Sequence, residues 1–170
     1  VYPAYADGEG GTTGNLLLSE RYGNKGFEAC QDPENVYSLA VLQRLSNKLY
    51  TLMNVALRTP EQINFIYTHY IHNAGTLLLE QILLQHGYIK ATLNNVNQVS
   101  PKYYIFHGEL KATESAPMLA HINNPRNSTG QHIRIIIGTR AISEGVTLKN
   151  VSHVHILQPH WNNTLIDQVI

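Results

Sequence analysis

The stretch from residue 133 to residue 158 reads IRIIIGTRAISEGVTLKNVSHVHILQ, and it decides the fold class. It begins with Ile133–Ile137, a nearly continuous apolar run that is typical of a strand covered on both faces. It ends with a second strand-like run, His153–Leu157. A polar segment that contains glycines separates the two runs. We therefore expect a sheet whose strands are buried on both faces.

Upstream of this stretch, helix-like and strand-like segments alternate. Apolar residues at spacings of three and four predict a helix that begins near Val36, after a start signal at Asp32–Glu34, and that closes at Pro60. The segments expected after it are a strand at 64–70, a helix at 75–86 ended by Gly87, a loop at 89–101, a strand at 103–107, a helix at 113–123 with Pro117 in its first turn, a turn at 124–130 and a last helix from 163. This order predicts an α/β fold with a doubly wound, mostly parallel sheet.

The first 35 residues differ in composition from the rest. They hold half of the twelve glycines and show no sustained apolar period. We predict that residues 1–35 form an irregular glycine-rich segment or linker, and that residues 36–170 form the domain. Because the chain opens on Val1 and stops in the middle of a pattern, we expect it to be a piece of a longer protein, with the domain cut short at its C-terminal end.

Composition excludes several classes of protein. Twelve Lys and Arg residues balance twelve Asp and Glu residues, which argues against a strongly basic nucleic-acid arm or a polybasic membrane anchor. Contact with nucleic acid through hydroxyl and amide donors stays open. The single cysteine, Cys30, excludes an internal disulfide framework. No apolar run approaches the ~18 residues of a membrane span, so we expect no membrane partner. The nine histidines, among them His153, His155 and His160, form no convergent ligand set, so we expect no metal.

Ligands of doubly wound sheets bind outside the carboxyl ends of the strands. At the end of the strand 133–137, Gly138 lets the backbone approach a ligand, while the Thr139 hydroxyl and free amides suit a phosphate oxygen. Glu144 is placed to accept hydrogen bonds from a ribose, although a plain turn with a capping glutamate explains the same residues. The sequence contains no G-x-x-x-x-G-K-[ST] motif, so the chain does not cradle a triphosphate by that route. The predicted strand ends are Thr68-His69, His107-Gly108, Gly138–Arg140 and Gln158–His160.

Several segments between residues 46 and 170 follow the order of the motifs of a known family. The longest, 135–162, matches the pattern iiIGTxAxSEGxxLkNVxxVHILxPhWN almost throughout. The others are 65–70 with Gly75 and the leucine-rich 77–84, then 86–88, 105–108, the Asn-rich 122–130, and 168–170 as the opening of an arginine-containing motif. In these segments the chain resembles the C-terminal RecA-like lobe of superfamily 2 helicases, in particular the poxvirus-type helicase and nucleoside triphosphatase group of large DNA viruses.

The resemblance implies roles for seven residues. Those implied to lie along the nucleic-acid backbone are Thr68, Gly108, Thr139 and Arg140. Those implied to belong to the ATP site between two lobes are Glu144, Gly145 and Gln168, the last as the start of a segment whose arginines act on the γ-phosphate. Thr147 departs from the pattern, because many related helicases carry an aspartate there. Glu144 is therefore the better candidate for the ribose.

The resemblance also implies partners and a location. The full-length protein would be a nucleic-acid-dependent ATPase that uses ATP and Mg²⁺, with DNA or RNA and a missing N-terminal RecA-like lobe as partners. The chain alone is expected to be inactive and to bind no cofactor by itself. The expected location is intracellular, in the host cytoplasm or the virion of a large DNA virus.

Two other interpretations stay open on the sequence. Ser143–Gly145 gives a partial likeness to the C-terminal lobe of two-domain nucleotide-sugar glycosyltransferases, although Ser152 stands where that family often has a second glutamate. The chain would otherwise be a non-catalytic RecA-like lobe used for assembly.

Overall fold

The computed structural model of the chain describes residues 18–20, 27–29, 37–70, 75–108, 112–139, 142 and 146–158. The predicted helix start at 32–34 and the predicted last helix from 163 lie outside these residues. The chain divides into two units, one made of residues 1–57 and 70–87 and the other of residues 58–69 and 88–170.

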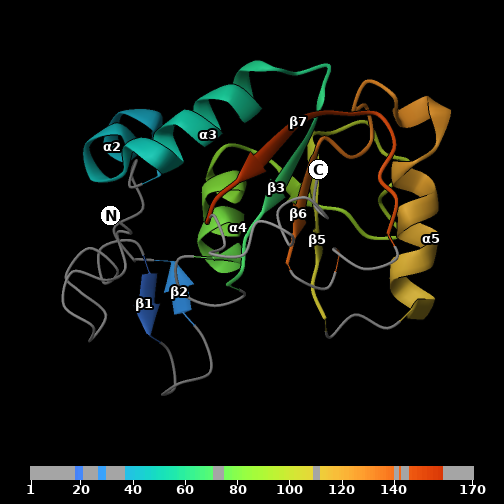
Figure 1. The fold of residues 1–170 in the computed structure, drawn as a ribbon, viewed down its shortest axis with the longest axis horizontal. Coiled ribbons are helices and arrows are strands. Elements are labelled where there is room, and N and C mark those ends of the chain that lie inside the picture. Colours follow the sequence, from blue (N-terminus) through green and yellow to red (C-terminus); the bar gives the residue numbers. More distant parts are fainter. Residues whose placement is uncertain are drawn as a thin grey trace. The chain divides into compact units, whose positions relative to one another are not determined.

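Among its described residues, the first unit contains a small sheet and three helices (Figure 1). Strands β1 (Leu18–Glu20) and β2 (Phe27–Ala29) pair antiparallel. They lie within residues 1–35, for which the sequence predicted no regular structure. The sequence did not reveal them because strands of three residues are too short to show a period. The helices are α2 (Leu39–Leu45), α3 (Asn47–Arg58) and α4 (Thr76–Gln85).

The single helix predicted between Val36 and Pro60 is wrong in one respect, because Ser46 divides it into α2 and α3. The backbone of Ser46 is extended, which ends α2. Its hydroxyl then accepts a hydrogen bond from the Leu49 amide at 3.4 Å and so begins α3. A serine can satisfy orphan helix amides without interrupting the apolar pattern, so the periodicity runs on through the break. α3 stops at Arg58, two residues before Pro60.

The helix α4 lies where the sequence predicted it. Gly87 follows it with φ of +79°, the left-handed conformation that ends many helices. At this end the Gln85 Oε1 atom accepts from the Tyr37 amide at 3.0 Å, and the His86 ring lies 3.0 Å from the Tyr37 carbonyl. These contacts tie Tyr37, two residues before α2, to the C-terminal end of α4.

The second unit is built on a five-stranded sheet with the order β4-β5-β6-β3-β7. Every pair in it is parallel (Figure 1), so the predicted α/β class with a parallel sheet is confirmed. All residues of β3, β5 and β6 are buried, as predicted. The same expectation is wrong for β7, whose residues are partly buried or exposed because it is an edge strand. The strands are β3 (Ile63–Tyr67), β4 (Ile89–Lys90), β5 (Lys102–Phe106), β6 (Ile135–Gly138) and β7 (Val151–Ile156).

One helix of this unit packs on the sheet. α5 (Ala112–Ile122) contributes Met118 and Ile122 to a core shared with β3, β5 and β6. The sequence predicted Pro117 in the first turn of this helix, but Pro117 lies in the second turn of α5. A proline there removes one backbone hydrogen bond of the helix. A short 3₁₀ helix, η1 (Pro125–Asn127), follows in the predicted turn segment.

Two loops of the second unit are fixed by buried polar side chains. Asn127, fully buried after α5, accepts at Oδ1 from the amides of His132 and Ile133 and donates from Nδ2 to the carbonyls of Ile122 and Ile133. Lys102, also fully buried, opens β5.

The ammonium group of Lys102 donates to the carbonyls of Gln98 and Ser100, and burial lowers its pKa. The loop predicted at 89–101 begins with the two residues of β4 and then runs through turns to these carbonyls. The sequence missed β4 because two residues carry no period.

Candidate functional site

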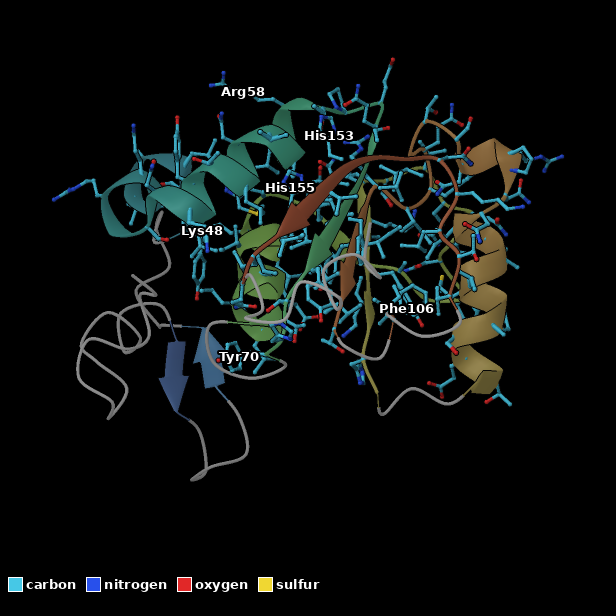
Figure 2. All side chains as sticks on the ribbon, viewed as in Figure 1. Lys48, Arg58, Tyr70, Phe106, His153 and His155 are labelled. Carbon is cyan, nitrogen blue, oxygen red and sulfur yellow. The ribbon has the colours of Figure 1, made fainter. Side chains whose placement is uncertain are left out.

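The ends of four strands lie next to one another along one side of the sheet. We call this row, made of Phe106–Gly108, Gly138–Thr139, Tyr67–His69 and Ile156–Gln158, the carboxyl edge. Figure 2 labels Phe106, the last residue of β5. The hydrogen bonds that join the row run from the Thr139 amide to the Phe106 carbonyl (3.1 Å), from the Thr68 amide to the Gly138 carbonyl (3.0 Å) and from the Leu157 amide to the Tyr67 carbonyl (2.9 Å). The structure thus brings together three of the predicted contact residues, Gly108, Thr139 and Thr68, in the order of their strands.

Thr139 is buried, and its hydroxyl donates only weakly. The side chain is 3% exposed, and its Oγ1 lies 3.4 Å from the Phe106 carbonyl. A hydrogen bond of this length is well beyond the optimum for a hydroxyl donor. The proton can therefore move to a stronger acceptor, such as a phosphate oxygen, at little cost.

The amides of this turn differ from the expectation. The Thr139 amide already donates to the Phe106 carbonyl, and the Ile142 amide donates to the Thr139 carbonyl. The free amides that the sequence predicted are therefore not found at these two positions, because the backbone continues the pairing of β6 with β5 and then turns. The hydroxyl, and not the amide, is the donor that Thr139 can offer.

Gly138 is required by packing. A Cβ atom at this position would lie 2.7 Å from the Ile142 Cγ2 atom and 2.7 Å from the Phe65 ring. Real Cβ atoms do not approach other atoms so closely. The glycine that the sequence assigned to close approach of a ligand serves here to let β6 pass the side chain of β3.

Gln158 organises the end of β3. Its Oε1 atom accepts from the Thr68 hydroxyl at 2.8 Å and from the His69 amide at 2.9 Å. Thr68 is fully buried and Gln158 is 8% exposed. The His69 ring packs edge-on against Tyr67, with centroids 5.1 Å apart. Sequence reasoning placed Gln158 at a strand end but gave it no role, and only its position directly after a strand could have drawn attention to it.

A second polar cluster lies between β3 and the edge strand β7. His153 and His155, both labelled in Figure 2, lie on β7. Their rings stack with centroids 6.1 Å apart, which confirms that the two residues share one face of the strand. The His155 Nε2 atom lies 2.9 Å from Asn64 Oδ1. Because Asn64 uses its Nδ2 atom to donate to Thr59 and to the Gln62 carbonyl, its Oδ1 must accept, so Nε2 carries the proton of the His155 ring. Burial, and secondly the neighbouring His153, lowers the pKa of His155.

The other predicted site residues, Arg140, Glu144, Gly145 and Gln168, lie outside the residues that the structure describes. The structure therefore does not test whether these residues fit ATP. Among the described residues, no group of three or more His, Cys, Asp or Glu side chains could hold a metal ion. No helix in the described part of the chain is long and apolar enough to cross a membrane.

Comparison with known proteins bears on the identity of this fold. The family model described as "Helicase conserved C-terminal domain" matches residues 47–170. The chain is 28% identical over 168 residues to "Putative helicase 087L" of Invertebrate iridescent virus 3, a match that covers 88% of the chain and 17% of the relative. It is 32% identical over 156 residues to "Putative helicase 009L" of Frog virus 3, covering 91% of the chain and 16% of the relative.

A shorter match extends to the poxvirus-type group. The chain is 31% identical over 68 residues to "Termination factor NPH-I homolog" of African swine fever virus, which covers 40% of the chain and 10% of the relative. The chain spans about a sixth of the length of the two iridescent and frog virus relatives. The parallel sheet, the row of strand ends and the match over residues 47–170 agree, and the chain belongs to the family of the helicase conserved C-terminal domain.

Proposed function

We propose that the chain is the C-terminal lobe of a nucleic-acid-dependent ATPase, and that its carboxyl edge contacts the phosphate backbone of a single strand. The observation that carries this function is the alignment of Gly108, Thr139 and Thr68 along one edge of a parallel sheet, where ligands of such sheets bind. The family membership supports the same assignment. It does not favour the glycosyltransferase alternative.

The charge of the chain indicates how this lobe would grip nucleic acid. Twelve basic residues are balanced by twelve acidic ones. With few phosphates neutralised by cations, the affinity should depend on salt less steeply than that of a basic protein. Hydroxyl and amide donors then position the strand, as they do in many protein–nucleic acid contacts.

The ATP site belongs to the full-length protein in this proposal. A second RecA-like lobe would hold the triphosphate and Mg²⁺, while Arg140, Glu144, Gly145 and Gln168 keep their roles as predictions. When bound, ATP supplies the phosphoryl group whose transfer drives the motor. Because relatives come from large DNA viruses, we also propose that the protein works inside the infected host cell or the virion.

Thr139→Val tests the proposed contact. Valine keeps the shape of the side chain and removes the hydroxyl, and a hydrogen bond to a charged phosphate is worth roughly 1.5–3 kcal/mol. We expect the full-length protein to bind a fluorescein-labelled oligo(dT) strand about ten- to a hundred-fold more weakly at one fixed ionic strength. Thr139→Ser should retain binding.

Thr113→Val, at an exposed position on α5, is the matched control and should leave both affinity and melting temperature unchanged. If Thr139→Val instead lowers the melting temperature and leaves the affinity intact, Thr139 only caps its turn and the contact is contradicted. A non-catalytic assembly lobe predicts no binding of the strand by any of these proteins.

A further inference from the structure

The side-chain amide of Gln158 is held in one orientation. Its Oε1 atom accepts two hydrogen bonds, from the Thr68 hydroxyl and from the His69 amide. A flipped amide would place its NH₂ group against the His69 N–H, which is a donor and cannot accept. The orientation is therefore fixed by the backbone, and Nε2 is the nitrogen.

The Nε2 atom of Gln158 lacks an acceptor. It is buried, and no residue of the described chain accepts a hydrogen bond from it. The whole side chain is only 8% exposed. Leaving a buried donor unpaired destabilises a folded protein, so buried amides normally have partners. An amide that is fixed in orientation, buried and unpaired at the end of a parallel strand indicates a place for a ligand oxygen.

The same hydrogen bonds change the role of Thr68. At 2.8 Å the Thr68 hydroxyl gives its proton to Gln158 in a bond of ideal length. A hydroxyl has one proton, so Thr68 keeps only lone pairs for other contacts. A phosphate oxygen is also an acceptor, and the two would not form a hydrogen bond. Thr139 differs, because its hydroxyl is engaged only at 3.4 Å.

We propose that Gln158, through Nε2, is the hydrogen-bond donor to a backbone phosphate oxygen of single-stranded nucleic acid at the end of β3, and that Thr68 is the residue that positions it. This inference rests on the proposed function, but it makes Gln158, and not Thr68, the residue that contacts the phosphate at the end of β3. The proposal requires that binding exposes Nε2, which is buried in the free chain. The neutral donor suits a lobe with no excess of basic residues.

Gln158→Glu separates donation from positioning. A glutamate keeps an oxygen for the Thr68 hydroxyl and the His69 amide, and it replaces the NH₂ group with an acceptor that repels phosphate. We expect the full-length protein to lose about ten- to a hundred-fold in affinity for a fluorescein-labelled oligo(dT) strand. Lys90→Gln makes the same change in net charge at an exposed position on β4, and it should change the affinity by about twofold at most.

Thr68 variants test the positioning role. Thr68→Ser keeps the hydroxyl and should bind like the wild type. Thr68→Val should lose less affinity than Gln158→Glu, because the His69 amide still holds the Gln158 oxygen. Gln158→Met, which is neutral, should also weaken binding, and it serves as the measurement if the glutamate prevents folding.

Two results would overturn the inference, and they differ from each other. Full loss of affinity in Thr68→Val, with Gln158→Glu and Gln158→Met binding like the wild type, makes the threonine hydroxyl the donor. No binding of the strand by the wild type at any ionic strength contradicts the proposed function itself, and the role of Gln158 with it.

Discussion

Asn127 is the residue on which the loop between α5 and β6 depends. Its single side chain makes four hydrogen bonds to backbone groups of Ile122, His132 and Ile133, and it is fully buried. Removing it leaves buried amides and carbonyls without partners, at a cost of about 1–3 kcal/mol for each group that water does not reach. The Asn-rich segment noted in the sequence is therefore structural at this position.

We predict that Asn127→Ala lowers the free energy of unfolding by about 3 kcal/mol or more. Asn124→Ala is the matched control, because Asn124 is exposed and its side chain makes one capping hydrogen bond, to the Arg126 amide. It should cost about 1 kcal/mol or less. Urea denaturation of the two variants and the wild type measures both values. Equal losses in the two variants would show that the four hydrogen bonds of Asn127 stabilise the domain no more than the single capping bond of Asn124 does.

His155 should make the stability of the domain depend on pH. Its pKa in the folded chain lies below the ordinary value of 6.5, chiefly because of burial and secondly because of His153. Well above pH 6.5 the ring is neutral in both the folded and the unfolded chain, so the free energy of unfolding does not depend on its titration. As the pH falls below 6.5, the unfolded chain binds a proton that the folded chain does not, so the free energy of unfolding decreases until the pH passes the folded pKa.

The variant His155→Gln should show a smaller loss of stability between pH 7.5 and pH 5 than the wild type, since its amide does not titrate. Denaturation curves across this range, at ~0.15 M ionic strength, give the slopes. His121→Gln, on α5, is the control for a histidine of the same chain away from β7. If His155→Gln and the wild type have the same slope, the ring is not held neutral by its surroundings.

At the scale of elements, the close approach of β3 to β6 depends on Gly138, which has no side chain. The two strands pair directly, and Tyr67 lies opposite Gly138. We predict that Gly138→Ala destabilises the domain by about 1–3 kcal/mol, because its Cβ atom would overlap Phe65 and Ile142. Thermal melts measure this loss. Phe65→Leu should restore part of it, and no restoration would place the strain elsewhere.

The sequence predicts the long elements and not the short ones. Continuous apolar runs identified β3, β5 and β6, and glycine with apolar spacing identified α4. The pair β1 and β2, and β4, have too few residues for a period. The break at Ser46 leaves the apolar spacing unchanged, so nothing in the pattern reveals it.

The candidate site was predictable to the same degree. Topology alone places Thr68, Gly108 and Thr139 at one edge, because parallel strands end together. The role proposed for Gln158 could not be predicted from the sequence, because it depends on the orientation of the side-chain amide and on which neighbours donate to its oxygen. Hydrogen-bond direction is a property of the folded chain, and no residue type or spacing encodes it.

For the molecule as a whole, the sequence contains no phosphate-binding motif of the G-x-x-x-x-G-K-[ST] type. We predict that the 170-residue chain releases no phosphate from ATP above the background, with or without oligo(dT). A colorimetric phosphate assay beside a heat-inactivated sample measures this. The full-length protein in the same assay is the positive control. Turnover by the chain would contradict the division of labour proposed between two lobes.

The order of the strands has a consequence for how the protein is made. Strand β3 lies between β6 and β7, so Asn64 has no partner until Ile135, 71 positions later in the chain, has been synthesised. At a synthesis rate of about 5–20 residues per second, the apolar segment INFIY spends roughly 4–14 seconds on the ribosome before its first neighbouring strand is made. During that interval it is a strand without a sheet, open to pairing with other nascent chains. Yield from a host cell should therefore depend on how fast translation runs between these two segments and on the chaperones present.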